Sequence, residues 1–171
     1  MRWPGLIALG LSLSSATVAL AQMPTYNLGR APTAEELGGN YLAVSPKGTE
    51  LPPGSGTAQQ GAQIFAAKCQ MCHGREGTGG PYNRLVGDGT NTAEFPFATI
   101  IWDFINRAMP RRLPYIGIRG ESLTPGEVYA LTAYLLFRNK IVKEDEVLDA
   151  RTLPRVRMPN RNSYLDRLAP R

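Results

Sequence analysis

The spacing of apolar residues predicts a helix over residues 57–69. Its apolar positions recur every third or fourth residue and share one face: Ala58, Ala62, Phe65 and Cys69. Thr57, followed three residues later by Gln60, is a capping box, a pattern with which helices begin. Gly61 lies on the same stripe and lowers helix propensity, so we expect a close contact with another helix there.

A second helix is predicted over residues 97–108, followed directly by Met109 and Pro110. One face is apolar, with Ala98, Ile101, Trp102, Ile105 and Ala108, and the other is polar, with Thr99, Asp103, Asn106 and Arg107. We expect Trp102 to pack in the core rather than to act as a redox relay. Because Pro110 disfavours helical backbone at the residue before it, Met109 should be extended.

A third helix begins at a second capping box, in which Thr124 is the N-cap, Pro125 the first helical residue and Glu127 the residue at N3. Residues 128–137 are apolar on nearly every side. A helix of this kind must be buried all round. We therefore expect it to lie between the first helix, the candidate site and the C-terminal segment.

The remaining segments lack a helical pattern. Residues 22–55 contain many prolines and glycines and are interpreted as an extended N-terminal arm. Residues 74–89 form a glycine-rich loop that includes Pro81, and the polar, proline-containing residues 140–171 indicate an extended C-terminal strap. Residues 56–139 remain as one domain, which predicts an all-α class with three to four helices.

Residues 1–21 have the pattern of a secretory signal. Arg2 precedes an apolar run from Gly5 to Leu20, and Ala19 and Ala21 provide a small-residue cleavage site. The run is shorter than the roughly 20 apolar residues of a membrane span. We expect cleavage after Ala21, a periplasmic location and no membrane span afterwards, with an uncleaved anchor as the alternative.

The formal net charge of +5 is mild, and the basic excess lies mostly in the C-terminal segment. An exported chain without interleaved basic and aromatic residues is a poor candidate for nucleic-acid binding. A basic surface near a redox site suits docking to an acidic protein partner, although many charge runs are only solvated faces.

The run Cys69-Gln70-Met71-Cys72-His73 carries the most specific chemistry. Two thiols three residues apart, followed by histidine, form the attachment sequence of c-type haem: the thiols become thioethers to the porphyrin and the histidine an axial iron ligand. The chain has two cysteines and one histidine in all. We therefore expect one haem c, attached at Cys69 and Cys72 and ligated by His73.

Three other interpretations of this motif are weaker. A structural zinc site needs four protein ligands, and the cluster offers three. A thioredoxin-like redox pair needs a βαβ setting, whereas helix and glycine loop surround these cysteines. A simple disulfide leaves His73 without a role.

Met109 is our candidate for the second axial ligand, because its extended backbone frees the thioether to project beyond the helix. The alternatives are that Met158 is the ligand, or that neither methionine is. In the purely structural alternative, Met109 only fills a gap in the core. The free ring N–H of an axial histidine needs a partner, commonly a backbone carbonyl. Pro81 is the candidate for that carbonyl, unless it is an ordinary turn proline.

The order of these parts resembles a class I cytochrome c. The chain runs from a helix ending in CxxCH through a glycine loop with a proline, an amphipathic helix and Met-Pro to a buried C-terminal helix, over about residues 56–139. The resemblance implies a helical fold around one covalent haem, with Gly61 and Phe65 packed against Tyr134. It also implies that the Pro81 carbonyl is the partner of the His73 ring N–H and that Met109 is the second axial ligand.

A narrower similarity extends over the segments LPPGSGT (51–57), FINRAMP (104–110) and LTPGEVYALTAYLLFRNKIVKEDEV to TLPRVRMPN (123–160). These are similar to cytochrome subunits of molybdenum sulfite or sulfane dehydrogenases, including the haem subunit of the Sox sulfur-oxidising system. The Sox subunit typically carries two haem domains, whereas this chain has one. The similarity implies a partner enzyme rather than an activity of this chain alone.

The leading hypothesis is one-electron transfer in the periplasm, from a molybdenum-dependent sulfur dehydrogenase to another cytochrome or an oxidase. Arg107, Arg111 and Arg112, which flank Met109, are candidates for docking. The alternatives are a carrier for another periplasmic dehydrogenase, a haem enzyme or gas sensor with an open distal site, and a structural subunit whose haem is incidental.

Overall fold

The structure is a computed structural model that describes residues 29–31, 33, 43–110, 122–162 and 164. The predicted signal segment with its cleavage after Ala21, and the docking candidates Arg111 and Arg112, lie outside these residues. The chain divides into two units, 1–32 and 33–171, and all elements below belong to the second.

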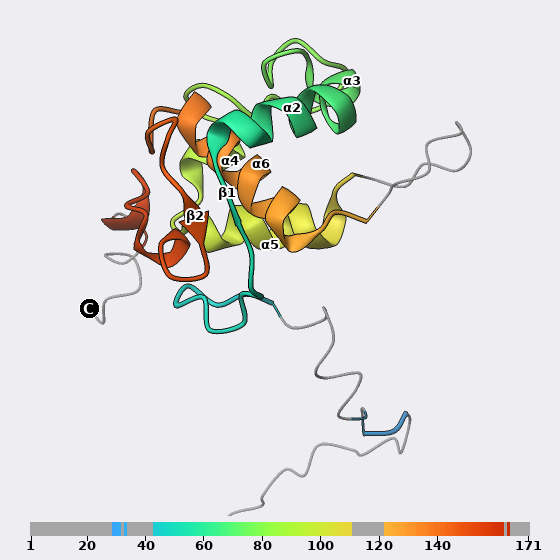
Figure 1. Ribbon diagram of the computed structural model, residues 1–171, viewed down its shortest axis with the longest axis vertical. Helices are drawn as coiled ribbons and strands as arrows, with labels where there is room; N and C mark the ends of the chain where they lie inside the picture. The colour runs from blue at the N-terminus through green and yellow to red at the C-terminus, as the bar shows by residue number, and fades with distance from the viewer. Residues whose placement is uncertain (1–28, 32, 34–42, 111–121, 163, 165–171) are drawn as a thin grey trace, which may run out of the picture. The chain divides into compact units, whose positions relative to one another are not determined.

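Three longer helices organise the second unit, as Figure 1 shows: α2 (Ala58–Lys68), α5 (Ala98–Ala108) and α6 (Pro125–Arg138). All three were predicted from the apolar pattern, and the predictions are confirmed. Both capping boxes form. The hydroxyls of Thr57 and Thr124 accept the N–H of the residue at N3, and the side chains at N3 accept the N–H of the cap.

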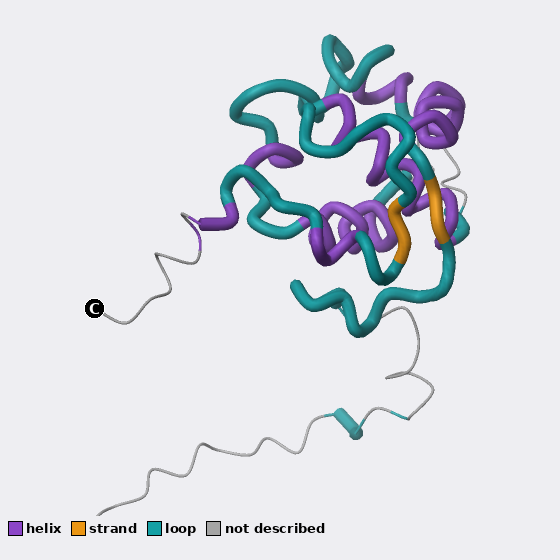
Figure 2. Tube along the Cα trace, turned by 60° about the vertical axis from the view of Figure 1, so that its left-hand side comes forward, coloured by secondary structure: helices purple, strands orange, loops and turns teal. Residues whose placement is uncertain are grey.

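The structure adds short elements that the sequence analysis did not predict. They are the helices α3 (Gln70–His73) and α4 (Asn91–Glu94), the strands β1 (Ser55–Gly56) and β2 (Leu148–Asp149), and the 3-10 turn η2 (Leu153–Arg155). The two strands pair antiparallel and lie side by side in Figure 2. The helical fold agrees with the prediction, but the described residues contain five helices instead of three to four, because elements of two to four residues carry no periodic pattern.

Helices α2 and α6 cross in close contact at Gly61. A Cβ atom at this position would collide with the backbone carbonyl of Ala130 and lie 2.7 Å from the Cβ of Tyr134. Next to the crossing, the rings of Phe65 and Tyr134 lie 5.0 Å apart. The expected contact of Gly61 and Phe65 with Tyr134 is therefore confirmed.

Helix α6 is buried along its length, as its composition predicted. Every residue from 128 to 136 is buried. The one polar side chain in this stretch, Thr132, donates to the carbonyl of Val128 at 2.7 Å, which satisfies its hydroxyl within the helix. β1, β2, α2, α4 and α5 all contact α6, so this helix is the centre of the core.

The described part of the arm packs against α5 and α6. Val44 and Leu51 belong to the core. The N–H of Val44 donates to the Oδ1 of Asp103 at 3.3 Å, and the hydroxyl of Tyr129 donates to the carbonyl of Pro52 at 3.0 Å. These bonds join the arm to helices that follow it by many residues.

The prediction of a polar face on α5 is partly wrong, because two of its residues are buried. Thr99 is fully buried and Asp103 is 7% exposed, whereas Phe104 is half exposed. Asp103 pairs with Arg107 and accepts from the arm, so its buried carboxylate is satisfied. Periodicity identified the two faces but could not show that a distant segment covers the polar one. Trp102 is 1% exposed in the core, as expected, with its ring 5.4 Å from that of Tyr129.

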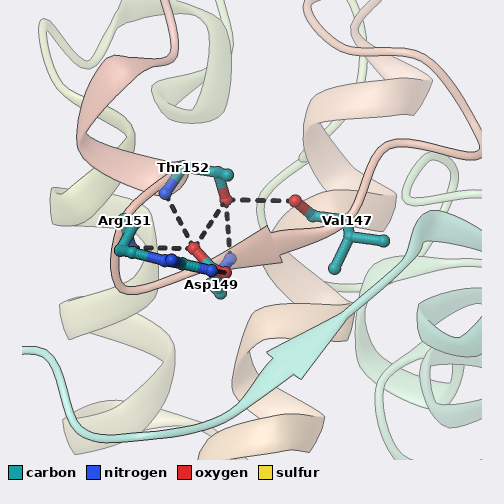
Figure 3. Close-up of polar contacts among 4 residues, drawn as sticks. All are labelled: Val147, Asp149, Arg151 and Thr152. Carbon is teal, nitrogen blue, oxygen red and sulfur yellow. Dashed lines mark hydrogen bonds and ion pairs between the residues drawn. The ribbon is translucent and has the colours of Figure 1, made fainter.

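A compact turn follows β2 (Figure 3). The Oδ1 of Asp149 accepts the N–H groups of Arg151 and Thr152, each at 2.8 Å, and the hydroxyl of Thr152 accepts the N–H of Asp149 at 2.8 Å. These bonds lower the pKa of the Asp149 carboxyl. The turn directs the chain to Leu153, which is fully buried in the core.

Within the described ranges, no helix is long and apolar enough to cross a membrane.

Replacing Gly61 with alanine should reduce the free energy of unfolding by about 1–3 kcal/mol, because the added methyl group displaces α2 from the backbone of α6. Gly126→Ala is the matched control, since a Cβ there would meet only the carbonyl of Ser55, at 3.4 Å. Urea unfolding measures both variants. Equal stabilities of the two would show that the helices do not depend on this approach.

Tyr129→Phe should unfold about 1 kcal/mol more easily than the wild type at pH 8, because it loses the hydrogen bond to Pro52. Burial, and secondarily the carboxylate of Asp149, raise the pKa of Tyr129 from 10.0 to about 12. The unfolded chain therefore loses this proton first, and the contribution of Tyr129 to stability is complete below about pH 10 and lost as the pH rises through 12.

The difference in unfolding free energy between wild type and Tyr129→Phe should consequently narrow between pH 10 and 12. Urea titrations across this range measure it. A difference that stays constant with pH would contradict the burial effect on Tyr129.

Candidate functional site

Cys69 and Cys72 lie on one helical turn at the end of α2. Cys69 is both the C-cap of α2 and the N-cap of α3. Its carbonyl accepts the N–H of Cys72 at 3.1 Å and that of His73 at 3.0 Å. Residues three apart on a helix share a face. The two thiols are thus held side by side, and both are free and half buried.

Burial raises the pKa of the Cys69 thiol to about 11; nearby Lys68 offsets this in part, and Cys72 adds to it. A catalytic redox cysteine requires a lowered pKa and an exposed thiolate. Cys69 has neither property, and helices rather than a βαβ unit surround it. The thioredoxin-like interpretation is therefore disfavoured.

His73 has one ring nitrogen engaged. Its Nδ1 lies 2.9 Å from the carbonyl oxygen of Asn83. Because a carbonyl can only accept, Nδ1 donates in this contact, and in the neutral form of the ring the lone pair is then on Nε2. A neutral imidazole in this tautomer is the form that binds a metal through Nε2.

The carbonyl that contacts His73 belongs to Asn83 and not to Pro81, so our prediction for Pro81 is wrong. The loop explains the difference. The N–H of Tyr82 donates to the carbonyl of Cys72 at 3.1 Å, which holds the loop against the motif, and the carbonyl that reaches the His73 ring from there is that of Asn83. Asn83 was missed because any residue can supply a backbone carbonyl, and no side chain marks it in the sequence.

The glycine loop closes mainly on its own backbone. A Cβ at Gly80 would collide with the carbonyl of Cys72, and the N–H of Leu85 donates to the carbonyl of Gly77 at 2.8 Å. Only glycine permits this close approach. The glycines thus permit the loop to turn back towards the motif.

The sequence-predicted thiols, His73 and Met109 line one cavity of about 370 Å³. This volume lies in the range of ligand-binding pockets. Helices α5 and α6 supply apolar walls, among them Ile101, Ile105, Leu131 and Leu135. Residues separated by forty positions in the sequence therefore meet in one largely apolar pocket.

Met109 occupies the extended position that was predicted for it, with φ −128° and ψ 147°, directly after α5. It is half buried and lies on the cavity wall. Met158, the competing candidate, is 4% exposed in the hydrophobic core and is not part of the cavity wall. The structure favours Met109 over Met158.

The donor set fits a covalent haem better than a bare metal ion. Among the described residues, no three His, Cys, Asp or Glu side chains are placed to hold a metal ion together. Two adjacent thiols, an imidazole with a free Nε2 and a thioether instead border one apolar cavity. These are the groups that attach and ligate haem c.

Arg107, one of the three docking candidates, is less available to a partner than the sequence indicated. Arg107 forms an ion pair with Asp103, so its charge is largely balanced on its own helix.

Comparisons with known proteins agree with this site. The family model for cytochrome c oxidase, cbb3-type, subunit III, matches residues 56–135. Among solved structures, the sulfane dehydrogenase SoxCD from Paracoccus pantotrophus contains a chain with 31% sequence identity. That match covers 81% of this chain and 71% of the other, with a TM-score of 0.68. Comparison with curated proteins gives no match.

Proposed function

Because this chain belongs to the cytochrome c family, we propose that it carries single electrons with one haem c as its cofactor. The observation that carries the proposal is the meeting of Cys69, Cys72, His73 and Met109 at one apolar cavity. The single CxxCH motif of the sequence accounts for one haem.

Each of these side chains has a distinct role. Cys69 and Cys72 would tether the porphyrin as thioethers, and His73, through Nε2, and Met109, through its thioether, would hold the iron. The bound haem supplies a one-electron change at its iron. Chemistry at iron needs an open or labile position, and two strong axial ligands leave none. This ligand set favours an electron carrier over a peroxidase or a gas sensor.

The apolar walls from α5 and α6 keep water away from the site. Burial and a low dielectric are among the means by which a protein sets a haem potential, together with the identity of the axial ligands. A thioether paired with histidine raises the potential relative to two nitrogen ligands. Met109 and the walls therefore act in the same direction.

We infer that the electron donor is a molybdenum-dependent sulfite or sulfane dehydrogenase, with this chain as its subunit or partner. Support comes from the SoxCD match, which covers 81% of the chain and so extends beyond the haem domain of residues 56–139. A downstream cytochrome or an oxidase would accept the electron. Another periplasmic dehydrogenase is the alternative donor.

The remaining assignments follow from the sequence pattern. Residues 1–21 direct export and are removed after Ala21, residues 22–55 form the arm, and residues 140–171 form the strap. The haem would then be attached in the periplasm, and the dehydrogenase partner would be located there as well.

Met109→Ala tests the ligand assignment directly. The wild type should have the mass of the polypeptide plus one haem, show the ferric sulfur-to-iron absorption band in the near infrared, and resist carbon monoxide when reduced. Met109→Ala should lose the band completely and bind carbon monoxide, because one axial position is open.

Met158→Leu is the matched control and should keep both wild-type properties, since Met158 lies in the core. Persistence of the band in Met109→Ala would contradict the ligand assignment. Rapid binding of carbon monoxide by the wild type would favour a haem enzyme or sensor instead.

The partner assignment is tested by mixing the oxidised protein with purified sulfur dehydrogenases and sulfite, thiosulfate or sulfide. We expect the haem absorption to change to the reduced form with at least one pair, and only when both enzyme and substrate are present. Reduction by an unrelated periplasmic dehydrogenase, with none by any sulfur enzyme, would refute the sulfur assignment and leave electron transfer intact.

A further inference from the structure

Asn139, the residue directly after α6, makes three side-chain hydrogen bonds. Its Nδ2 donates to the carbonyls of Leu135 at 2.8 Å and Leu85 at 3.0 Å, and its Oδ1 accepts the N–H of Gly87 at 3.0 Å. A side-chain amide offers two donors and an acceptor, and all are used here. Asn139 thus joins the end of α6 to two residues of the glycine loop.

These loop residues lie just beyond the carbonyl that contacts His73. Asn83 is followed by Leu85 and Gly87, which Asn139 binds. On the other side of Asn83, the N–H of Tyr82 donates to the carbonyl of Cys72. The Asn83 carbonyl therefore belongs to a short stretch of backbone that is fixed on both sides, at the motif and at α6.

We propose that Asn139 is a positioning residue for His73: it holds the loop so that the Asn83 carbonyl accepts a hydrogen bond from the Nδ1–H of His73. This inference rests on the proposed function, since it concerns the axial ligand of that same site. Asn139 makes no contact with the cofactor in this role. It acts through Leu85 and Gly87 on Asn83, and through Asn83 on His73.

The hydrogen bond at Nδ1 affects the iron in two ways. It fixes the plane of the imidazole ring, and it makes the ring a more basic ligand. A more basic ligand favours ferric iron, so the bond lowers the reduction potential. Freeing the loop from α6 should weaken the bond, let the ring rotate and raise the potential.

A second link between α6 and the same loop provides a control. Arg138 forms an ion pair with Glu76 at 2.9 Å, but Glu76 is 63% exposed on its side chain and precedes the turn back towards Asn83. Exposed ion pairs contribute little to stability. Glu76→Gln removes this link and leaves the hydrogen bonds of Asn139 and Asn83 in place.

The test compares wild type, Asn139→Ala, Asn139→Ser and Glu76→Gln as holoproteins with covalent haem verified by mass. Two quantities are measured: the hyperfine-shifted haem methyl resonances of the ferric protein, which report the orientation of the axial ligands, and the midpoint reduction potential. Thermal unfolding is recorded alongside, so that a loss of stability can be separated from an effect on His73.

We expect Asn139→Ala to change the haem methyl shifts and to raise the potential. Asn139→Ser, whose hydroxyl replaces the amide with a single hydrogen-bonding group, should shift both in the same direction and by less. Glu76→Gln should match the wild type in both. Wild-type shifts and potentials in the Asn139 variants would overturn the proposal, whatever their melting temperatures, because Asn139 would then act on stability alone.

Hydrogen exchange in the wild-type holoprotein gives a result that needs no variant. If Asn139 holds the carbonyl in place, the N–H of Gly87 and the Nδ1–H of His73 should be exposed by the same opening and show similar protection. A protection factor at His73, corrected for the faster intrinsic exchange of an imidazole N–H, about tenfold lower than that at Gly87 would overturn the proposal. A wild-type protein without covalent haem contradicts the proposed function itself, before Asn139 is compared.

Discussion

The backbone contact between α2 and α6 at Gly61 determines how the rest of the site is arranged. A hydrogen atom in place of a side chain lets α2 lie directly on the carbonyl of Ala130. The ring pair of Phe65 and Tyr134 and the ion pair of Lys68 with Glu127 at 3.0 Å extend this contact along both helices. Since α2 leads directly into Cys69 and α6 leads directly into Asn139, the crossing sets the distance between the thiols and the loop that serves His73.

The burial of residues 128–136 of α6 ties this arrangement to the core. An extended arm, two strands and the C-terminal segment cover the sides of α6 that α2 and α5 leave open, and Leu148 and Leu153 bring the latter into the core. At Asp103 the arm also reaches the polar side of α5, where the N–H of Val44 donates to the buried carboxylate. As α5 ends at Met109, the same packing that fixes α5 also places the thioether at the cavity.

The sequence was sufficient for whatever depends on local pattern. The three long helices, their capping boxes, the extended backbone of Met109 and the contact of Gly61 with α6 all follow from periodicity, capping residues and proline sterics. It was insufficient where a backbone group or a distant segment decides the outcome. The Asn83 carbonyl has no signature in its own residue, and the burial of Asp103 depends on Val44, far away along the chain. Asn139 has no pattern either, because its partners are two loop backbone groups.

The side chains at the cavity are positioned in two different ways, some by the packed helices and one by a loop. The thiols and Met109 are attached to the ends of helices that pack against the core, so their positions follow from the fold itself. His73 also lies on a helical turn, but the orientation of its ring depends on a loop carbonyl and hence on hydrogen bonds that span the glycine loop. The fold can therefore keep the same four donors while the loop changes the basicity of one of them. If the chain carries a haem as proposed, such a loop allows its potential to be adjusted without rebuilding the core.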